Sequence, residues 1–108
     1  MTVSFQLDGQ EFLALNGGPQ FTFSHAVSFI ANCENQEEVD RLWEALSEGG
    51  EEEQCGWLKD RYGVSWQIVP TVLADLMLGG TPEKAEKVMK TLLQMKKIDI
   101  EALKRAYQ

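Results

Sequence analysis

The sequence has few of the residues on which most protein chemistry depends. Its 108 residues include one histidine and two cysteines, Cys33 and Cys55. These cysteines form neither a CxxC metal motif nor the framework of several disulfides that is typical of small secreted domains. We expect both to be free thiols, which suits a reducing compartment. The cysteine content therefore favours the cytoplasm.

Long apolar runs and positive charge are also scarce. No stretch approaches the roughly 18 apolar residues of a membrane-spanning helix, and residues 1–5 lack the basic flank and apolar run of a signal peptide. Lys and Arg number 10 against 17 Asp and Glu, a formal net charge of −7. Affinity for nucleic acids depends largely on Lys and Arg that displace counterions. We therefore predict a soluble protein with neither membrane nor nucleic acid as a partner.

The common catalytic motifs are absent as well. The sequence contains no GxxxxGK[ST], GxGxxG, GxSxG or HExxH motif. Gly17-Gly18 is interpreted as a turn, because a cofactor loop normally follows a strand and opens a helix in a doubly wound sheet. A lone histidine such as His25 is more often a surface or structural residue than a ligand. Cys55 is either a small half-buried thiol or a nucleophile that His25 activates, and the sequence leaves both alternatives open.

The pattern that is present predicts a β-hairpin near the start of the chain. In residues 2–7 apolar side chains alternate with polar ones, Asp8-Gly9 supplies the turn, and residues 12–15 resume an apolar run. The sequence Asn-Gly-Gly-Pro at 16–19 ends the second strand, because glycine and proline interrupt a strand ladder. A linker is expected from there to about Ser24.

The middle of the chain predicts a β-α-β-β(-β) unit. Residues 25–33 are rich in β-forming residues, Asn35 can cap a helix that ends at Gly49-Gly50, and residues 51–70 favour two or three further strands. From residue 71 onward the apolar residues recur at helical spacing. We predict one α+β domain over residues 1–108, with a hairpin before this unit and helices after it.

The last predicted strand carries one polar residue of special interest. Side chains alternate between the two faces of a strand, so Trp66 and Ile68 share one face while Ser65 and Gln67 share the other. We expect Trp66 and Ile68 to pack under the helix that contains Trp43. A buried amide needs a hydrogen-bond partner or a ligand, so Gln67 is the most informative residue of the sequence.

Three blocks of the sequence carry a resemblance: residues 36–43 (QEEVDRLW), 55–70 (CGWLKDRYGVSWQIVP) and 93–99 (LQMKKID). They resemble PhnB-like proteins, the group labelled 3-demethylubiquinone-9 3-methyltransferase. This resemblance implies the vicinal oxygen chelate superfamily of glyoxalase I, bleomycin-resistance proteins and extradiol dioxygenases. In that superfamily, paired βαβββ modules curl around a cavity.

The chain departs from the family's pattern in two ways. Family members carry two modules, whereas residues 2–16 resemble only the last two strands of the first module, so its start is missing here. We therefore expect a homodimer in which a second copy supplies the absent strands, with strand exchange as one arrangement. The superfamily's metal enzymes place His on the first strand and Glu on the last, and the matching residues here are Ala26 or Ser28, and Gln67. The side chain of His25 would point to the opposite face of the strand from the ligand position, so it cannot replace the missing histidine. We expect no metal and no cofactor.

The leading hypothesis is a protein of unassigned reaction that binds a small organic molecule, as drug-sequestering relatives do. Its cavity would be lined by Ser28, Trp57, Ser65 and Gln67. The alternatives are a metal-dependent lyase or dioxygenase of the same superfamily and a methyltransferase as the family label suggests. A dimer whose cavity is filled by its own side chains is a further alternative.

Overall fold

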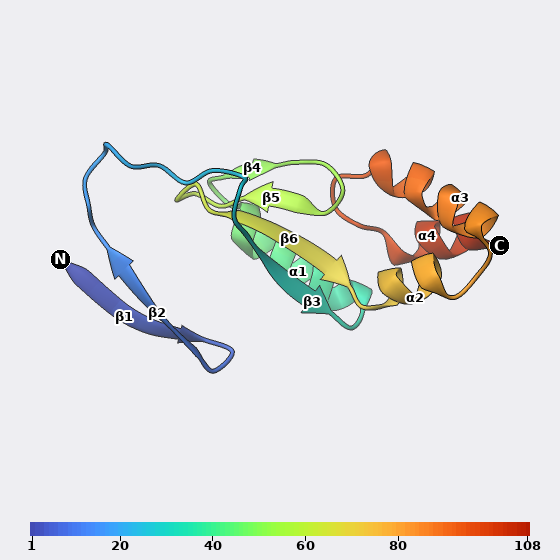
Figure 1. The fold of residues 1–108 in the computed structure, drawn as a ribbon, viewed down its shortest axis with the longest axis horizontal. Coiled ribbons are helices and arrows are strands. Elements are labelled where there is room, and N and C mark those ends of the chain that lie inside the picture. The colour runs from blue at the N-terminus through green and yellow to red at the C-terminus, as the bar shows by residue number, and fades with distance from the viewer.

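Three parts follow one another along the chain in the computed structural model, which describes all 108 residues. A two-stranded hairpin comes first, then a four-stranded sheet with one helix, then a group of three helices (Figure 1). The molecule measures 52 × 27 × 22 Å, because the hairpin and the helices lie at opposite ends. Its radius of gyration of 16.0 Å exceeds the value of about 13 Å for a compact domain of this length.

The predicted hairpin is confirmed. Strand β1 (Thr2–Leu7) pairs antiparallel with β2 (Gln10–Leu15). Asp8 and Gly9 join them with φ angles of 52° and 80°, the left-handed conformation that a type I′ turn requires at both central residues. Aspartate followed by glycine is the local signal that makes this turn predictable.

The predicted βαβββ unit is also confirmed. Its four strands lie in the order β3-β6-β5-β4, with β3 parallel to β6 and the other pairs antiparallel. The helix begins after Asn35, whose side-chain oxygen accepts a hydrogen bond of 2.9 Å from the backbone N–H of Glu38. The bounds are β3 (Ser28–Cys33), α1 (Gln36–Ser47), β4 (Glu51–Glu52), β5 (Trp57–Lys59) and β6 (Ser65–Pro70).

The main hydrophobic core lies between α1 and one face of this sheet. Trp66 packs against it and Ile68 is part of it, which confirms that these two residues lie under the helix that contains Trp43. Since side chains alternate along β6, Gln67 lies on the opposite face. The buried members of this core are Cys33, Val39, Trp43, Leu58 and Ile68.

The C-terminal helices have a hydrophobic core of their own. They are α2 (Val72–Leu78), α3 (Pro82–Leu93) and α4 (Ile100–Tyr107). Thr81 and Asp99 cap α3 and α4 with their side-chain oxygens. None of the four helices combines the length and the apolar character needed to cross a membrane. The buried members of the second core are Leu76, Val88, Leu92, Ile98 and Leu103.

The turn before β5 joins the two cores. The backbone N–H groups of Cys55 and Gly56 donate hydrogen bonds of 2.8 Å to the carbonyls of Met95 and Lys96. Gly56 has a φ of +84°, and a Cβ atom there would lie 2.8 Å from Cδ1 of Ile98. Only glycine fits both the conformation and the space.

A glutamine side chain makes a second connection between the sheet unit and the helices. Gln36, at the start of α1, donates to the carbonyl of Ile98 at 3.0 Å and accepts from the backbone N–H of Ile100 at 2.8 Å. An ion pair of 2.9 Å between Lys97 and Asp40 of α1 adds to these connections between the C-terminal helices and the sheet unit.

Candidate ligand-binding site

The four predicted site residues lie on the sheet face opposite α1. In the strand register, Trp57 of β5 is directly across from Gln67 of β6, and Ser28 of β3 is beside Ser65. The amide Nε2 of Gln67 donates a hydrogen bond of 2.9 Å to the hydroxyl of Ser28. The structure therefore brings Gln67 and Ser28 into contact, with Trp57 on the next strand. We call this surface the open face.

The open face is uncovered in the single chain around Ile30, Trp57 and Gln67, whereas Ser65 at the start of β6 is buried. Ile30, the neighbour of Gln67 on β3, is 57% exposed, and Trp57 and Gln67 are half-buried. Helix α1 lies on the other side of the sheet (Figure 1). None of the four main hollows of the molecule is lined by Ser28, Trp57 or Gln67. One chain thus offers these residues as a surface and does not enclose them.

A histidine and a carboxylate meet beside the open face. Nε2 of His25 lies 2.9 and 3.1 Å from the two carboxylate oxygens of Glu53, and the His25 ring centroid is 6.3 Å from that of Trp57. A carboxylate that holds an imidazole fixes its orientation and favours acid–base chemistry. Sequence reasoning missed this pair, because 28 residues separate its members and no motif links them.

The cysteines do not join this pair. Cys55 packs against the core of the C-terminal helices. The hydrogen bond from its backbone N–H to the carbonyl of Met95 holds it there. Cys33 is fully buried in the main core, where removal from water raises the pKa of its thiol. A buried thiol that stays protonated is a poor nucleophile, so Cys33 is a packing residue.

The residues at the positions where the resemblance would place metal ligands, Ala26 or Ser28 and Gln67, do not fit a transition metal. Ser28 and Gln67 supply a hydroxyl and an amide, which bond to each other, whereas such metals prefer imidazole, thiolate and carboxylate ligands. No three His, Cys, Asp or Glu side chains converge anywhere in the structure. Gly17-Gly18 leads through an irregular segment into β3 and opens no helix, so it does not fit a cofactor loop either.

A separate pocket of about 300 Å³ lies where the linker passes the start of β3 and β6. Of the four predicted residues only Ser65 lines it. Ser65 is 1% exposed, and its hydroxyl has no hydrogen-bond partner. A buried hydroxyl without a partner costs about 1 to 3 kcal/mol of stability. The other lining residues are Thr22, Phe23, Ser24, Val27, Phe29 and Val64.

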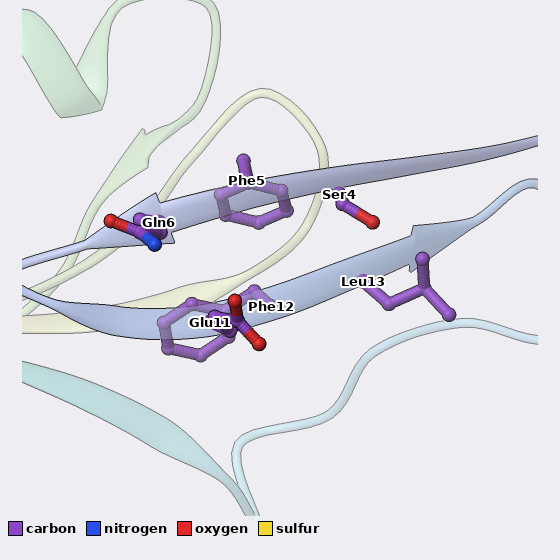
Figure 2. A pocket seen from close by; sticks show the side chains of 6 residues that line it. All are labelled: Ser4, Phe5, Gln6, Glu11, Phe12 and Leu13. Carbon is purple, nitrogen blue, oxygen red and sulfur yellow. The ribbon is translucent and has the colours of Figure 1, made fainter.

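The hairpin presents an uncovered apolar face. Phe5 and Phe12, on neighbouring strands (Figure 2), stack at 5.5 Å. Phe12 also meets Phe29 of β3 edge-on at 5.6 Å. Every residue of β1 is exposed, and in β2 only Phe12 is half-buried. An open hollow of about 560 Å³ at the hairpin is lined by Phe5 and Phe12 together with residues of the other face, Ser4, Gln6, Glu11 and Leu13 (Figure 2). The residues on the apolar face are Val3, Phe5, Leu7, Phe12 and Ala14.

Comparison with known proteins places these features in a family. The profile of the 3-demethylubiquinone-9 3-methyltransferase family matches residues 1–69, which ends within β6. The C-terminal helices and the block 93–99 lie beyond this match. No protein with a curated description is detectably similar to the chain.

Two solved structures share the fold. The PhnB protein of Bacillus cereus, which bears the name 3-demethylubiquinone-9 3-methyltransferase, is 34% identical over 66% of this chain, with a TM-score of 0.61. Protein PA1353 of Pseudomonas aeruginosa is 22% identical over 65% of the chain, with a TM-score of 0.53. The matches span 64% and 62% of the lengths of these two proteins. The chain belongs to the 3-demethylubiquinone-9 3-methyltransferase family, the PhnB-like proteins.

Proposed function

We propose that this protein binds a small organic molecule on its open face and does so without a transition metal. The observation that supports this most is the contact of Gln67 with Ser28 beside the ring of Trp57. That hydrogen bond uses one N–H of Gln67, so its carbonyl oxygen and second N–H remain free to bond a ligand. The indole of Trp57 offers a flat apolar surface for stacking.

A second copy of the chain would complete this site. Small-molecule sites usually bury about 70 to 90% of the ligand surface, which one open sheet face does not provide. The apolar face of the hairpin is exposed in its turn, and the chain is more extended than a compact domain. We propose a homodimer in which the hairpin of one copy covers the open face of the other. The two free cysteines suit a cytoplasmic location for this dimer.

The first experiment tests Gln67. Replacing Gln67 by alanine should weaken binding of 8-anilinonaphthalene-1-sulfonate by about tenfold, since one ligand hydrogen bond and its geometry are lost. Thermal stability should change little, because Gln67 is only half-buried. Fluorescence titration measures the affinity. The control is Gln94→Ala, an exposed glutamine among the C-terminal helices. Equal affinities in all three proteins would refute the assignment of the open face.

The second experiment measures metal content. We expect less than one transition-metal ion per chain in protein purified without a His-tag, because hydroxyl and amide groups stand at the metal positions. Inductively coupled plasma mass spectrometry gives the ratio. One zinc, nickel, manganese or iron per chain would overturn the metal-free proposal and favour the lyase or dioxygenase alternative.

Catalysis on the bound molecule is a second candidate function, and the pair of His25 and Glu53 favours it. The pair lies beside Trp57, where an oriented imidazole could accept a proton from a ligand. Replacing His25 by glutamine separates the two functions. Binding alone should survive this substitution, whereas any turnover of a bound compound should fall.

A further inference from the structure

The charges of the open face are unevenly placed. Glu51 of β4 and Lys59 of β5 are directly opposite in the strand register, so their charges offset each other. Side chains alternate along a strand, so Glu53 shares the face of Glu51, and its backbone N–H donates a hydrogen bond of 3.0 Å to the carbonyl of Trp57. Only His25 forms an ion pair with Glu53, and no Lys or Arg does. The uncompensated negative charge of this face therefore lies beside Trp57.

The carboxylate of Glu53 keeps free capacity for a ligand. Its contacts of 2.9 and 3.1 Å with His25 both come from one imidazole nitrogen, Nε2. An ionised carboxylate has about four lone-pair sites, and a single N–H occupies few of them. The side chain of Glu53 is 24% exposed, so a molecule on the open face can reach it.

The indole of Trp57 complements this carboxylate. The face of an aromatic ring carries partial negative charge and attracts cations, and tryptophan does so most strongly. The two cation–π contacts of the structure use other rings, with Arg61 over Tyr62 and Lys84 over Tyr107. No cation of the chain therefore occupies the ring of Trp57. The formal net charge of −7 further favours the approach of a cation from solution.

We propose that the molecule bound on the open face is a planar aromatic cation, of the class of N-alkylated heteroaromatic rings. This proposal rests on the proposed function and names the ligand class of the same site. The ring stacks on Trp57, and its positive nitrogen lies beside the carboxylate of Glu53. A neutral ring of the same shape gains the stacking alone. An anion such as 8-anilinonaphthalene-1-sulfonate also stacks, but it gains no ion pair there.

The test uses 1-methylquinolinium and 1-methylnaphthalene, which share one shape and differ by a positively charged nitrogen in place of a carbon. Each is titrated into the full chain at about pH 8, at which a free imidazole is uncharged. The indole N–H signal of Trp57 in the NMR spectrum reports binding. Glu53→Gln should weaken binding of 1-methylquinolinium by about tenfold and leave binding of 1-methylnaphthalene unchanged. The amide side chain can still accept the hydrogen bond of His25.

Glu44→Gln is the matched control. Glu44 is exposed on α1, on the other side of the sheet, so this variant removes the same charge away from the open face. Both affinities should stay unchanged in it, and the backbone amide spectrum verifies that each variant is folded. An equal effect of Glu53→Gln on the two compounds would overturn the ligand class, as would an equal effect of Glu44→Gln on the cation. The open-face site would then stand, because both compounds still shift the Trp57 signal. If neither compound shifts that signal, the open-face site itself is refuted, and the ligand class with it.

Discussion

Replacing Trp43 by alanine is expected to lower the free energy of unfolding by about 3 to 5 kcal/mol. Trp43 is 5% exposed and packs with Leu58 and Ile68 between α1 and the sheet. Its indole N–H also donates a hydrogen bond of 2.6 Å to a carboxylate oxygen of Glu52. Alanine would leave a void that a hydrogen-bonded sheet cannot close, whereas the exposed carboxylate of Glu52 can bond water instead. Urea denaturation followed by far-UV circular dichroism measures the loss.

The three tryptophans provide matched controls. Trp66 is half-buried at the edge of the same core, so Trp66→Ala should cost less than Trp43→Ala. Trp57 lies on the open face, and Trp57→Ala should cost least. If Trp43→Ala does not fold, Trp43→Phe keeps most of the apolar contact and gives a measurable value. If Trp57→Ala lowered the free energy of unfolding more than the other two substitutions, the placement of the core would be contradicted.

Replacing Phe5 by aspartate is expected to raise the dissociation constant of the homodimer by at least about 100-fold. Phe5 stacks on Phe12 at the centre of the hairpin's apolar face, which we propose covers the open face of a second copy. A carboxylate buried in that interface would have no partner. Dilution followed by analytical ultracentrifugation measures the dissociation constant. The interface should exceed roughly 1,000 Å², as stable protein interfaces do.

Ser4→Asp is the control for this experiment. Ser4 is the neighbour of Phe5 on the same strand, but its side chain points to the other face of the hairpin. The substitution Ser4→Asp introduces the same charge outside the proposed interface, so the dimer should persist. An unmodified chain that stays monomeric at micromolar concentration, with no loss of stability on dilution, would rule out the dimer.

Local signals made most of the fold predictable from the sequence. The Asp8-Gly9 turn, the Asn35 cap and the alternation around Gln67 each depend on a few neighbouring residues, and each is confirmed. The alternation of side chains along β6 also predicted correctly that Gln67 lies on the sheet face away from α1. Its hydrogen bond to Ser28 was not predictable, because it depends on which strands are neighbours in the sheet, and local residue patterns do not specify that order.

The features that escaped prediction depend on the path of the linker. The linker, which includes residues 16–24, has no periodicity, so nothing in it indicates that Phe23 lies against the start of β6. The contact of His25 with Glu53 arises in the same way, from the place where the linker enters β3. Both are long-range consequences of chain geometry, and residue patterns carry no information about them.

The glycine turn before β5 gives the C-terminal helices a mechanical role. Two backbone hydrogen bonds and the close approach of Ile98 clamp Cys55 and Gly56, and Trp57 follows directly. The backbone position of Trp57 therefore depends on the segment between α3 and α4. We expect a substitution in this segment to shift Trp57, although the segment lies apart from the open face.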